Sequence, residues 1–173
     1  MTVRTAVVVG NPKSGSRTLA AALHLARELA GEPDLVVDLA ELGGAVLDLD
    51  DERIFKLVEE VVSCDLVVFA SPTHKAALTG LLKAFLDRFP SEGLSGVVVV
   101  PLMLGAGPGH GLAVETSLRP VLTELGATVP VRGLYVLDAV HADPAAYTPW
   151  LATARPIIQA LAERRNQTAG AAS

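Results

Sequence analysis

Short runs of apolar residues alternate with longer amphipathic segments along the chain. The apolar runs are rich in valine and continuous rather than interrupted at every second position, which is typical of strands buried on both faces. Five such runs occur, at residues 3–9, 35–37, 66–70, 97–102 and 134–137. The pattern therefore predicts five parallel strands in the interior of the protein.

Between these runs, apolar residues recur at intervals of three and four, which is the period of an amphipathic helix. The predicted helices cover residues 19–30, 54–62, 78–89, 112–125 and 147 to about 164. Strand and helix thus alternate five times, and such alternation builds a parallel sheet with helices on both faces. The fold class is therefore α/β, a doubly wound three-layer sandwich.

The chain has 173 residues, which is the length of one domain and enough to bury a substantial core. We expect a single domain over residues 1–165, because no linker, internal repeat or low-complexity segment divides it. Residues 166–173 are small and polar without periodicity, and this composition predicts a flexible tail.

The overall charge and the cysteine content exclude several classes of protein. The 14 Lys and Arg residues are outnumbered by 19 Asp and Glu residues, and the net charge of −5 argues against a nucleic-acid or anionic membrane surface. The single cysteine, Cys64, allows no internal disulfide and no cysteine-rich metal site, and the four histidines lack metal-ligand spacing. No run is long enough to be a signal peptide or a membrane span, so we expect a cytoplasmic protein without a metal.

Three loops are expected to carry the function, because ligands of open α/β sheets bind outside the carboxyl ends of the strands. These loops are residues 10–18, 71–80 and 103–111, and all are rich in Gly, Pro, Ser, Thr or His. In contrast, Asp138 follows the last predicted strand, where we expect it to serve in a turn or a helix cap.

The first loop, "GNPKSGSRT", leads from a buried strand directly into a helix, and this arrangement is typical of an anion site. It is not a Walker A loop, because Ser16 and Arg17 occupy the positions of the required Lys and Ser/Thr. It is not a Rossmann fingerprint either, because Asn11 and Pro12 follow Gly10 where a second glycine should let the backbone approach a pyrophosphate.

A monophosphate cradle remains as the interpretation of this loop. Asn11, Ser16 and Thr18 supply hydrogen-bond donors, Lys13 and Arg17 supply positive charge, and the helix beginning near Arg17 supplies free N–H groups. The alternative is that Ser16 or Thr18 only caps the helix, with the two cations solvated.

The second loop is interpreted as one edge of a site for a flat ring, and the third loop as a segment of unusual backbone freedom. The backbone of residues Pro72 to Lys75 is expected to lie along one edge of a flat ring. The helix that begins at Thr79 and Gly80 carries an apolar stripe, which packs either in the core or against a helix of a partner subunit. The third loop, "MLGAGPGHG", has four glycines in nine residues, which indicates either close approach to a ligand or a mobile surface loop.

Three segments, "VGNPKSGSRT", "SPTHKAALTGLLKAFLDRFP" and "GHGLAVETSLRPVLTELGA", together resemble the NADPH-dependent FMN reductase family over residues 3 to 140. The resemblance implies a flavodoxin-like sheet of order 2-1-3-4-5, with FMN and NADPH or NADH as ligands. Histidine stands at position 74 where the family usually has tyrosine. The residues implied to bind the cofactor are Asn11, Lys13, Ser16, Arg17 and Thr18 at the phosphate, Pro72, Thr73, His74, Lys75 and Thr79 beside the flavin ring, and Gly105, Gly107, Gly109 and His110 at its other edge.

The same resemblance implies an activity and its mechanism. Hydride passes directly from the nicotinamide to FMN, so no side chain is required as a catalytic acid or base. The nearest branch of the family supplies reduced FMN to a partner monooxygenase, and the family forms homodimers or homotetramers. Two alternatives stay open: a reductase of the same fold that retains its flavin and reduces quinones, azo dyes or metal oxyanions, and a non-enzymatic electron carrier like a flavodoxin.

Overall fold

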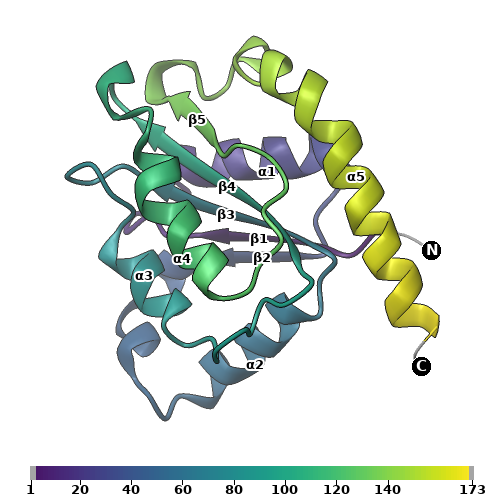
Figure 1. Cartoon of the computed structure of the whole chain (residues 1–173). Helices are drawn as coiled ribbons and strands as arrows, with labels where there is room; N and C mark the ends of the chain where they lie inside the picture. The colour runs from purple at the N-terminus through teal and green to yellow at the C-terminus, as the bar shows by residue number, and fades with distance from the viewer. Residues whose placement is uncertain (1–2, 172–173) are drawn as a thin grey trace.

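The computed structural model describes residues 3–171 and contains one five-stranded sheet. All neighbouring strands are parallel, and their order is β2-β1-β3-β4-β5 (Figure 1). The strands are β1 (Thr5–Val9), β2 (Leu35–Asp38), β3 (Leu66–Pro72), β4 (Val98–Gly105) and β5 (Leu134–Leu137). The predicted flavodoxin-like sheet is therefore confirmed, strand by strand and in its order.

Helices cover both faces of the sheet, as predicted (Figure 1). They are α1 (Arg17–Ala30), α2 (Glu52–Val62), α3 (Gly80–Leu86), α4 (Arg119–Glu124) and α5 (Thr148–Ala171). Side chains of α1 and α5 pack with one face of the sheet, and those of α2, α3 and α4 pack with the other. The result is a three-layer sandwich with a separate apolar core on each side of the sheet.

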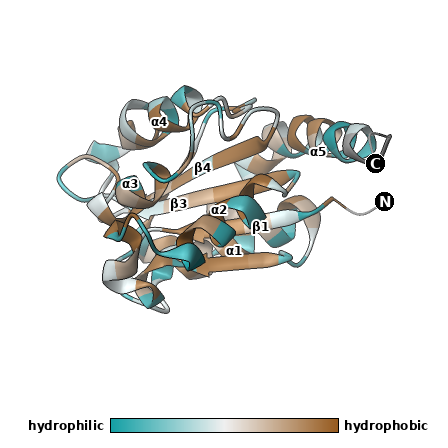
Figure 2. Cartoon of the chain, turned by 90° about the horizontal axis from the view of Figure 1, so that it is seen from below, coloured by the Kyte–Doolittle hydropathy of each residue, from teal (hydrophilic) through white to brown (hydrophobic). Residues whose placement is uncertain are grey.

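Strand β1 shows why continuous apolar runs predict the centre of this fold. All of its residues are buried, and successive side chains enter opposite cores: Val7 packs with α1 and α5, whereas Val8 packs with the α2, α3 and α4 side. Because both faces are covered, no position of the strand tolerates a polar side chain exposed to water. Figure 2 shows the same arrangement, with hydrophobic strands β3 and β4 running between helices that present hydrophilic residues outward.

Helix α3 is shorter than the predicted helix 78–89, and its apolar stripe faces the core. Phe85 and Phe89 are buried, and their rings meet edge to face with centroids 5.5 Å apart. Phe89 also contacts Phe69 of β3, with centroids 6.3 Å apart. Of the two alternatives for this stripe, the structure therefore supports the core for its two phenylalanines.

The predicted helix 112–125 divides into two parts. Residues Val114–Leu118 form a π-helical turn, in which the N–H of Arg119 donates to the carbonyl of Val114, and α4 follows. Pro120 has no N–H to donate to the carbonyl of Thr116 four residues earlier, so a regular α-helical ladder is interrupted at this point. The apolar period alone does not reveal such a widened turn.

Helix α5 continues to Ala171, past the predicted end near Arg164. Arg165 donates to the carbonyl of Val62 at 3.0 Å, and the Asn166 amide donates to Asp65 at 2.8 Å, so this part of the helix is tied to the main body. Of the predicted flexible tail, residues 166–171 extend α5 and residues 172–173 lie outside the described part of the chain. None of the helices within residues 3–171 combines the length and apolar composition that a membrane span requires.

Cys64 lies just before β3, at the edge of the sheet opposite the carboxyl ends. Its side chain is fully buried, and burial raises the pKa of the thiol to about 11. Because only the thiolate reacts, we expect no labelling of the native protein by a thiol reagent at neutral pH, but one label per chain in urea. A spectrophotometric thiol assay with and without urea checks this expectation, with Cys64→Ala as the blank, and full labelling without urea would contradict it.

Candidate functional site

Three loops meet at the carboxyl edge of the sheet, because β1, β3 and β4 are adjacent there. Val9 pairs with Ala70, and Pro72 pairs with Leu104, so the three loops begin side by side. A depression of about 320 Å³ opens at this edge. It is lined by Asn11, Lys13, Gly15, Ser16, Arg17, Thr18, Pro72, His74 and Asp138. The first loop thus contributes all of its predicted binding residues to one concave surface.

The first loop is held in shape by its own side chains and by β2. The Asn11 carbonyl oxygen Oδ1 accepts from the Lys13 N–H at 2.9 Å, and Asn11 Nδ2 donates to Thr18 Oγ1 at 3.0 Å. Gly15 adopts φ of 62°, a left-handed conformation that glycine takes without strain, and its N–H donates to Asp38 Oδ2 at 3.0 Å. Asp38, at the end of β2, therefore stabilises the conformation of the first loop, a role that the sequence analysis did not predict.

The hydroxyl groups of the first loop keep their hydrogens available for a ligand. Ser16 Oγ accepts from the Leu19 N–H at 3.2 Å as the N-cap of α1, and Thr18 Oγ1 accepts from Asn11. Each hydroxyl acts as an acceptor in these bonds, so its own hydrogen remains to be donated. The N–H groups of Arg17 and Thr18 have no intrahelical acceptor in the first turn, and the helix dipole favours an anion in front of them. Capping and anion binding are therefore compatible here.

Gly10 and Thr79 connect the first loop to α3. The Thr79 hydroxyl donates to the Gly10 carbonyl and accepts from the Leu82 N–H at 3.1 Å. A Cβ on Gly10 would lie 2.3 Å from Leu82 Cβ, so glycine permits the contact between loop and helix. Thr79 is only 2% exposed and does not line the depression. Its observed role is to hold the two ligand loops together, and its predicted contact with a cofactor stays a prediction.

The second loop is a tight hairpin. The N–H of His74 donates to the carbonyl of Ala77 at 2.9 Å, and the N–H of Ala77 donates back at 3.1 Å. Between them, Lys75 and Ala76 have φ of 51° and 63°, conformations that ordinary residues adopt at a cost of about 1 kcal/mol. The turn carries the exposed His74 side chain at the depression and the exposed Lys75 at its tip.

The third loop is anchored by Tyr135 of β5, whose hydroxyl donates to the Gly107 carbonyl at 2.8 Å. A Cβ on Gly105 would lie 2.0 Å from that hydroxyl oxygen, so this glycine is required by Tyr135, whereas Gly107 and Gly109 face open space. Together with the exposed His110, these glycines lie beside the depression rather than in its lining. Their contact with a ligand remains a prediction.

A buried polar atom lies between the second and third loops. Thr73 Oγ1 is buried and makes no hydrogen bond of standard geometry within residues 3–171. Burial raises the pKa of the neighbouring Tyr135 hydroxyl above its ordinary value, and a polar interaction with the Thr73 side chain opposes that rise. Thr73 does not line the depression, so its predicted contact with a ligand stays a prediction.

The charges around the depression favour an anion. Lys13 and Arg17 are exposed cations from the first loop and α1, and Asp138 contributes one carboxylate from the end of β5. The predicted role of Asp138 in a turn holds only in part, because it also lines the depression. Within residues 3–171, no cluster of three or more His, Cys, Asp or Glu side chains is arranged to hold a metal ion.

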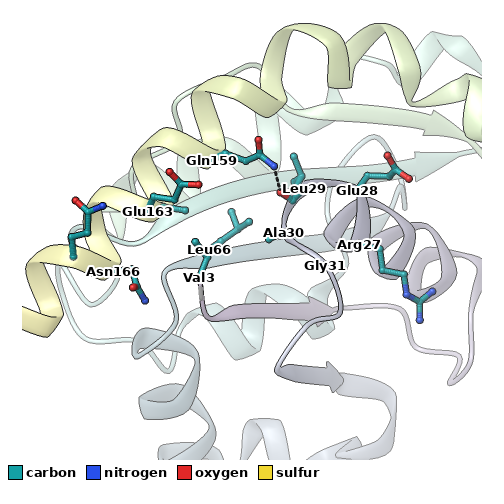
Figure 3. A pocket seen from close by; sticks show the side chains of 12 residues that line it. Val3, Arg27, Glu28, Leu29, Ala30, Gly31, Leu66, Gln159, Glu163 and Asn166 are labelled. Atoms are coloured by element: carbon teal, nitrogen blue, oxygen red, sulfur yellow. Dashed lines mark hydrogen bonds between the residues drawn. The ribbon is translucent and has the colours of Figure 1, made fainter. Parts of the chain in front are cut away.

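A larger cavity, of about 530 Å³, lies at the opposite edge of the sheet between α1 and α5 (Figure 3). Several of its polar side chains are already engaged. Gln159 donates to the carbonyl of Leu29 at 2.7 Å, and Arg27 and Glu28 form ion pairs with Glu32 and Arg155. We therefore take the smaller depression as the candidate functional site, because polar groups remain available there and it is lined by residues of the first loop, the second loop and the end of β5.

The chain is similar to several known proteins over most of its length. The sequence profile of the NADPH-dependent FMN reductase family matches residues 3–142. An FMN reductase (NADPH) of Escherichia coli is 34% identical over 143 residues, which cover 79% of this chain and 74% of that protein. An FMN-dependent NADH:quinone oxidoreductase of Methylorubrum populi is 35% identical, covering 69% of this chain and 78% of that protein. The structure of an NADH:FMN oxidoreductase in its apo form superposes with a TM-score of 0.78 at 24% identity, covering 96% of this chain and 90% of that one.

Proposed function

The chain belongs to the NADPH-dependent FMN reductase family, and from this premise we propose that it reduces FMN with NAD(P)H and releases the reduced flavin. It is an NAD(P)H-dependent oxidoreductase, as its relatives are. The observation that carries the proposal is the depression at the carboxyl edge, which is lined by two cations, two hydroxyl side chains and the first turn of α1.

The residues of this edge fit FMN. The phosphate of FMN would be held by Lys13 and Arg17 through charge, by the hydroxyls of Ser16 and Thr18, and by the free N–H groups of α1. The flavin ring would extend along the ends of β3 and β4, beside the buried Thr73 hydroxyl. This assignment gives the available donors of the first loop a ligand.

FMN, when bound, supplies the redox chemistry, because its ring accepts hydride from a nicotinamide. The protein has three tasks: it binds the phosphate, orients the ring and holds the loops in place. The hydrogen bond from Thr79 to Gly10 joins the second loop to the first, and the hydrogen bond from Tyr135 to Gly107 holds the third loop to β5. No side chain of the depression is assigned a catalytic proton transfer in this proposal.

Exposure of the charged groups supports flavin as a released substrate. Lys13, Arg17 and His74 all remain exposed to solvent around the depression. Exposed charges bind a phosphate more weakly than buried ones because water screens them. A site of this kind favours exchange of FMN with solution, which suits a reductase that supplies a flavin-dependent monooxygenase.

The oligomeric state and the location belong to the same proposal. Leu47, Leu49 and Phe55 expose large apolar surfaces, at 72%, 72% and 49%. This surface supports a homodimer or homotetramer, the assembly implied by the family resemblance. The single buried thiol of Cys64 suits a reducing compartment, and we place the protein in the cytoplasm.

A steady-state assay of NADPH and NADH oxidation, with and without added FMN, tests the function. We expect activity to depend on added FMN and to saturate with it, and the purified protein to be colourless. A yellow protein that oxidises NADH with a quinone and needs no added FMN would instead support the retained-flavin alternative, which the Methylorubrum relative favours. If FMN neither binds nor turns over, the assignment of the first loop is wrong.

A further inference from the structure

The third loop, residues 103–111, is folded around the side chain of Tyr135, which comes from β5. The Tyr135 hydroxyl donates to the Gly107 carbonyl at 2.8 Å. A Cβ on Gly105 would lie 2.0 Å from the hydroxyl oxygen, and a Cβ on Gly111 would lie 3.9 Å from Cδ1 of the same ring. The loop therefore approaches the tyrosine near its beginning, at its middle and at its end.

The second loop reaches the same tyrosine. The N–H of Thr73 donates to the carbonyl of Leu104 at 2.7 Å, which joins the second loop to the end of β4. Thr73 Oγ1 lies 3.4 Å from the point where a Cβ on Gly105 would be, and the Tyr135 hydroxyl lies beside that same point. Tyr135 thus stands where the second and third loops meet, in space that a side chain at position 105 would otherwise fill.

The order of the strands separates this junction from the phosphate donors. The first loop follows β1 and the third loop follows β4, with β3 between the two strands. Since neighbouring strands lie about 4.8 Å apart, the first and third loops begin about 10 Å from each other. FMN carries its phosphate and its ring at opposite ends of a sugar chain. With the phosphate in the first loop, the ring is the part of FMN that reaches the third loop.

We propose that Tyr135 is a positioning residue for the flavin ring, because its hydroxyl holds the third loop as a preformed wall against which the ring binds. The proposal deepens the proposed function and rests on it, since it takes FMN as the ligand. Four glycines give this loop more backbone freedom than other residues would, so its conformation depends on such an external hydrogen bond. A loop that is already ordered loses less conformational entropy when a ligand binds.

Tyr135→Phe tests the proposal, because it removes the hydroxyl and keeps the packed ring. The dissociation constants of riboflavin and FMN, measured by flavin fluorescence, are both expected to rise about fivefold, the usual effect of losing one neutral hydrogen bond. Inorganic phosphate, which competes with FMN at the first loop, is expected to have the same inhibition constant in variant and wild type. In the reductase assay, KM for FMN is expected to rise by the same factor, with kcat within about twofold of the wild type.

Tyr147→Phe is the matched control. The Tyr147 hydroxyl also donates to a backbone carbonyl, that of His141 at 2.7 Å, but this bond lies outside the three loops. Riboflavin binding of this variant is expected to stay within about twofold of the wild type. Hydrogen–deuterium exchange of the protein without flavin examines the loop itself: amides of residues 105–111 are expected to exchange faster in Tyr135→Phe than in the wild type, and those of β1 at the same rate.

Riboflavin binding of folded Tyr135→Phe equal to that of the wild type would overturn the inference. A loss of FMN binding without an equal loss of riboflavin binding would also overturn it, since the hydroxyl would then act at the phosphate. Unchanged exchange of residues 105–111 would show that the hydroxyl does not hold the loop. If the wild type binds neither flavin, the proposed function itself fails, and the exchange experiment still reports separately whether Tyr135 orders the loop.

Discussion

We expect the double variant Lys13→Ala/Arg17→Ala to bind FMN about 100-fold more weakly than the wild type and to retain its stability. Both side chains line the depression and are exposed, and neither side chain makes a hydrogen bond or ion pair within residues 3–171. A charge-assisted hydrogen bond to phosphate in such a position contributes about 1 to 1.5 kcal/mol, and two of them amount to about 100-fold in affinity. Fluorescence titration of FMN, together with urea unfolding, measures both quantities.

Two controls identify the phosphate as the group recognised. Lys56→Ala/Arg164→Ala removes the same charge from exposed positions that do not line the depression, and we expect it to leave FMN binding within twofold of the wild type. Riboflavin, which lacks the phosphate, is expected to bind the Lys13→Ala/Arg17→Ala variant as it binds the wild type. An equal loss for riboflavin and FMN would show that the two cations act on another part of the ligand.

The sheet could be predicted from the sequence because burial on both faces leaves a strong signal. Strand β5 agrees residue for residue with its predicted run, and β4 differs only at its ends. The course of the helices could be predicted less well where a local feature changes the backbone without changing the apolar period. Residues Val114–Leu118 form a π-helical turn just before Pro120, which cannot donate to the carbonyl of Thr116, and the period of apolar residues does not reveal this change.

The first loop was also predictable, since its donors and cations are close in sequence and precede a helix. The residues that hold the loops of the site in place could not be predicted, because they come from elements distant in the sequence. Asp38 holds Gly15 from β2, and Tyr135 holds the third loop from β5. The hairpin at Lys75 and Ala76 was missed because neither residue is a glycine or asparagine, the residues by which left-handed turns are usually recognised.

Gly10→Ala is expected to destabilise the protein by about 3 kcal/mol, a large part of the stability of an ordinary domain. The added Cβ would lie 2.3 Å from Leu82 Cβ and 3.0 Å from Leu82 Cα. These atoms belong to the first part of α3, where no flexible side-chain end can move aside. The helix must shift, and the hydrogen bond from Thr79 to the Gly10 carbonyl is weakened with it.

Urea unfolding followed by circular dichroism measures this loss, with Gly44→Ala as the matched control. Gly44 is exposed, has no left-handed φ, and a Cβ there meets no atom within 4 Å, so alanine should change the free energy of unfolding by less than about 0.5 kcal/mol. Because Thr79 caps α3 and lies in the second loop, we also expect Gly10→Ala to weaken FMN binding under conditions where it is still folded. If Gly10→Ala were as stable as Gly44→Ala, α3 would not rest on the start of the first loop, and the link that holds the two ligand loops together would have to lie elsewhere.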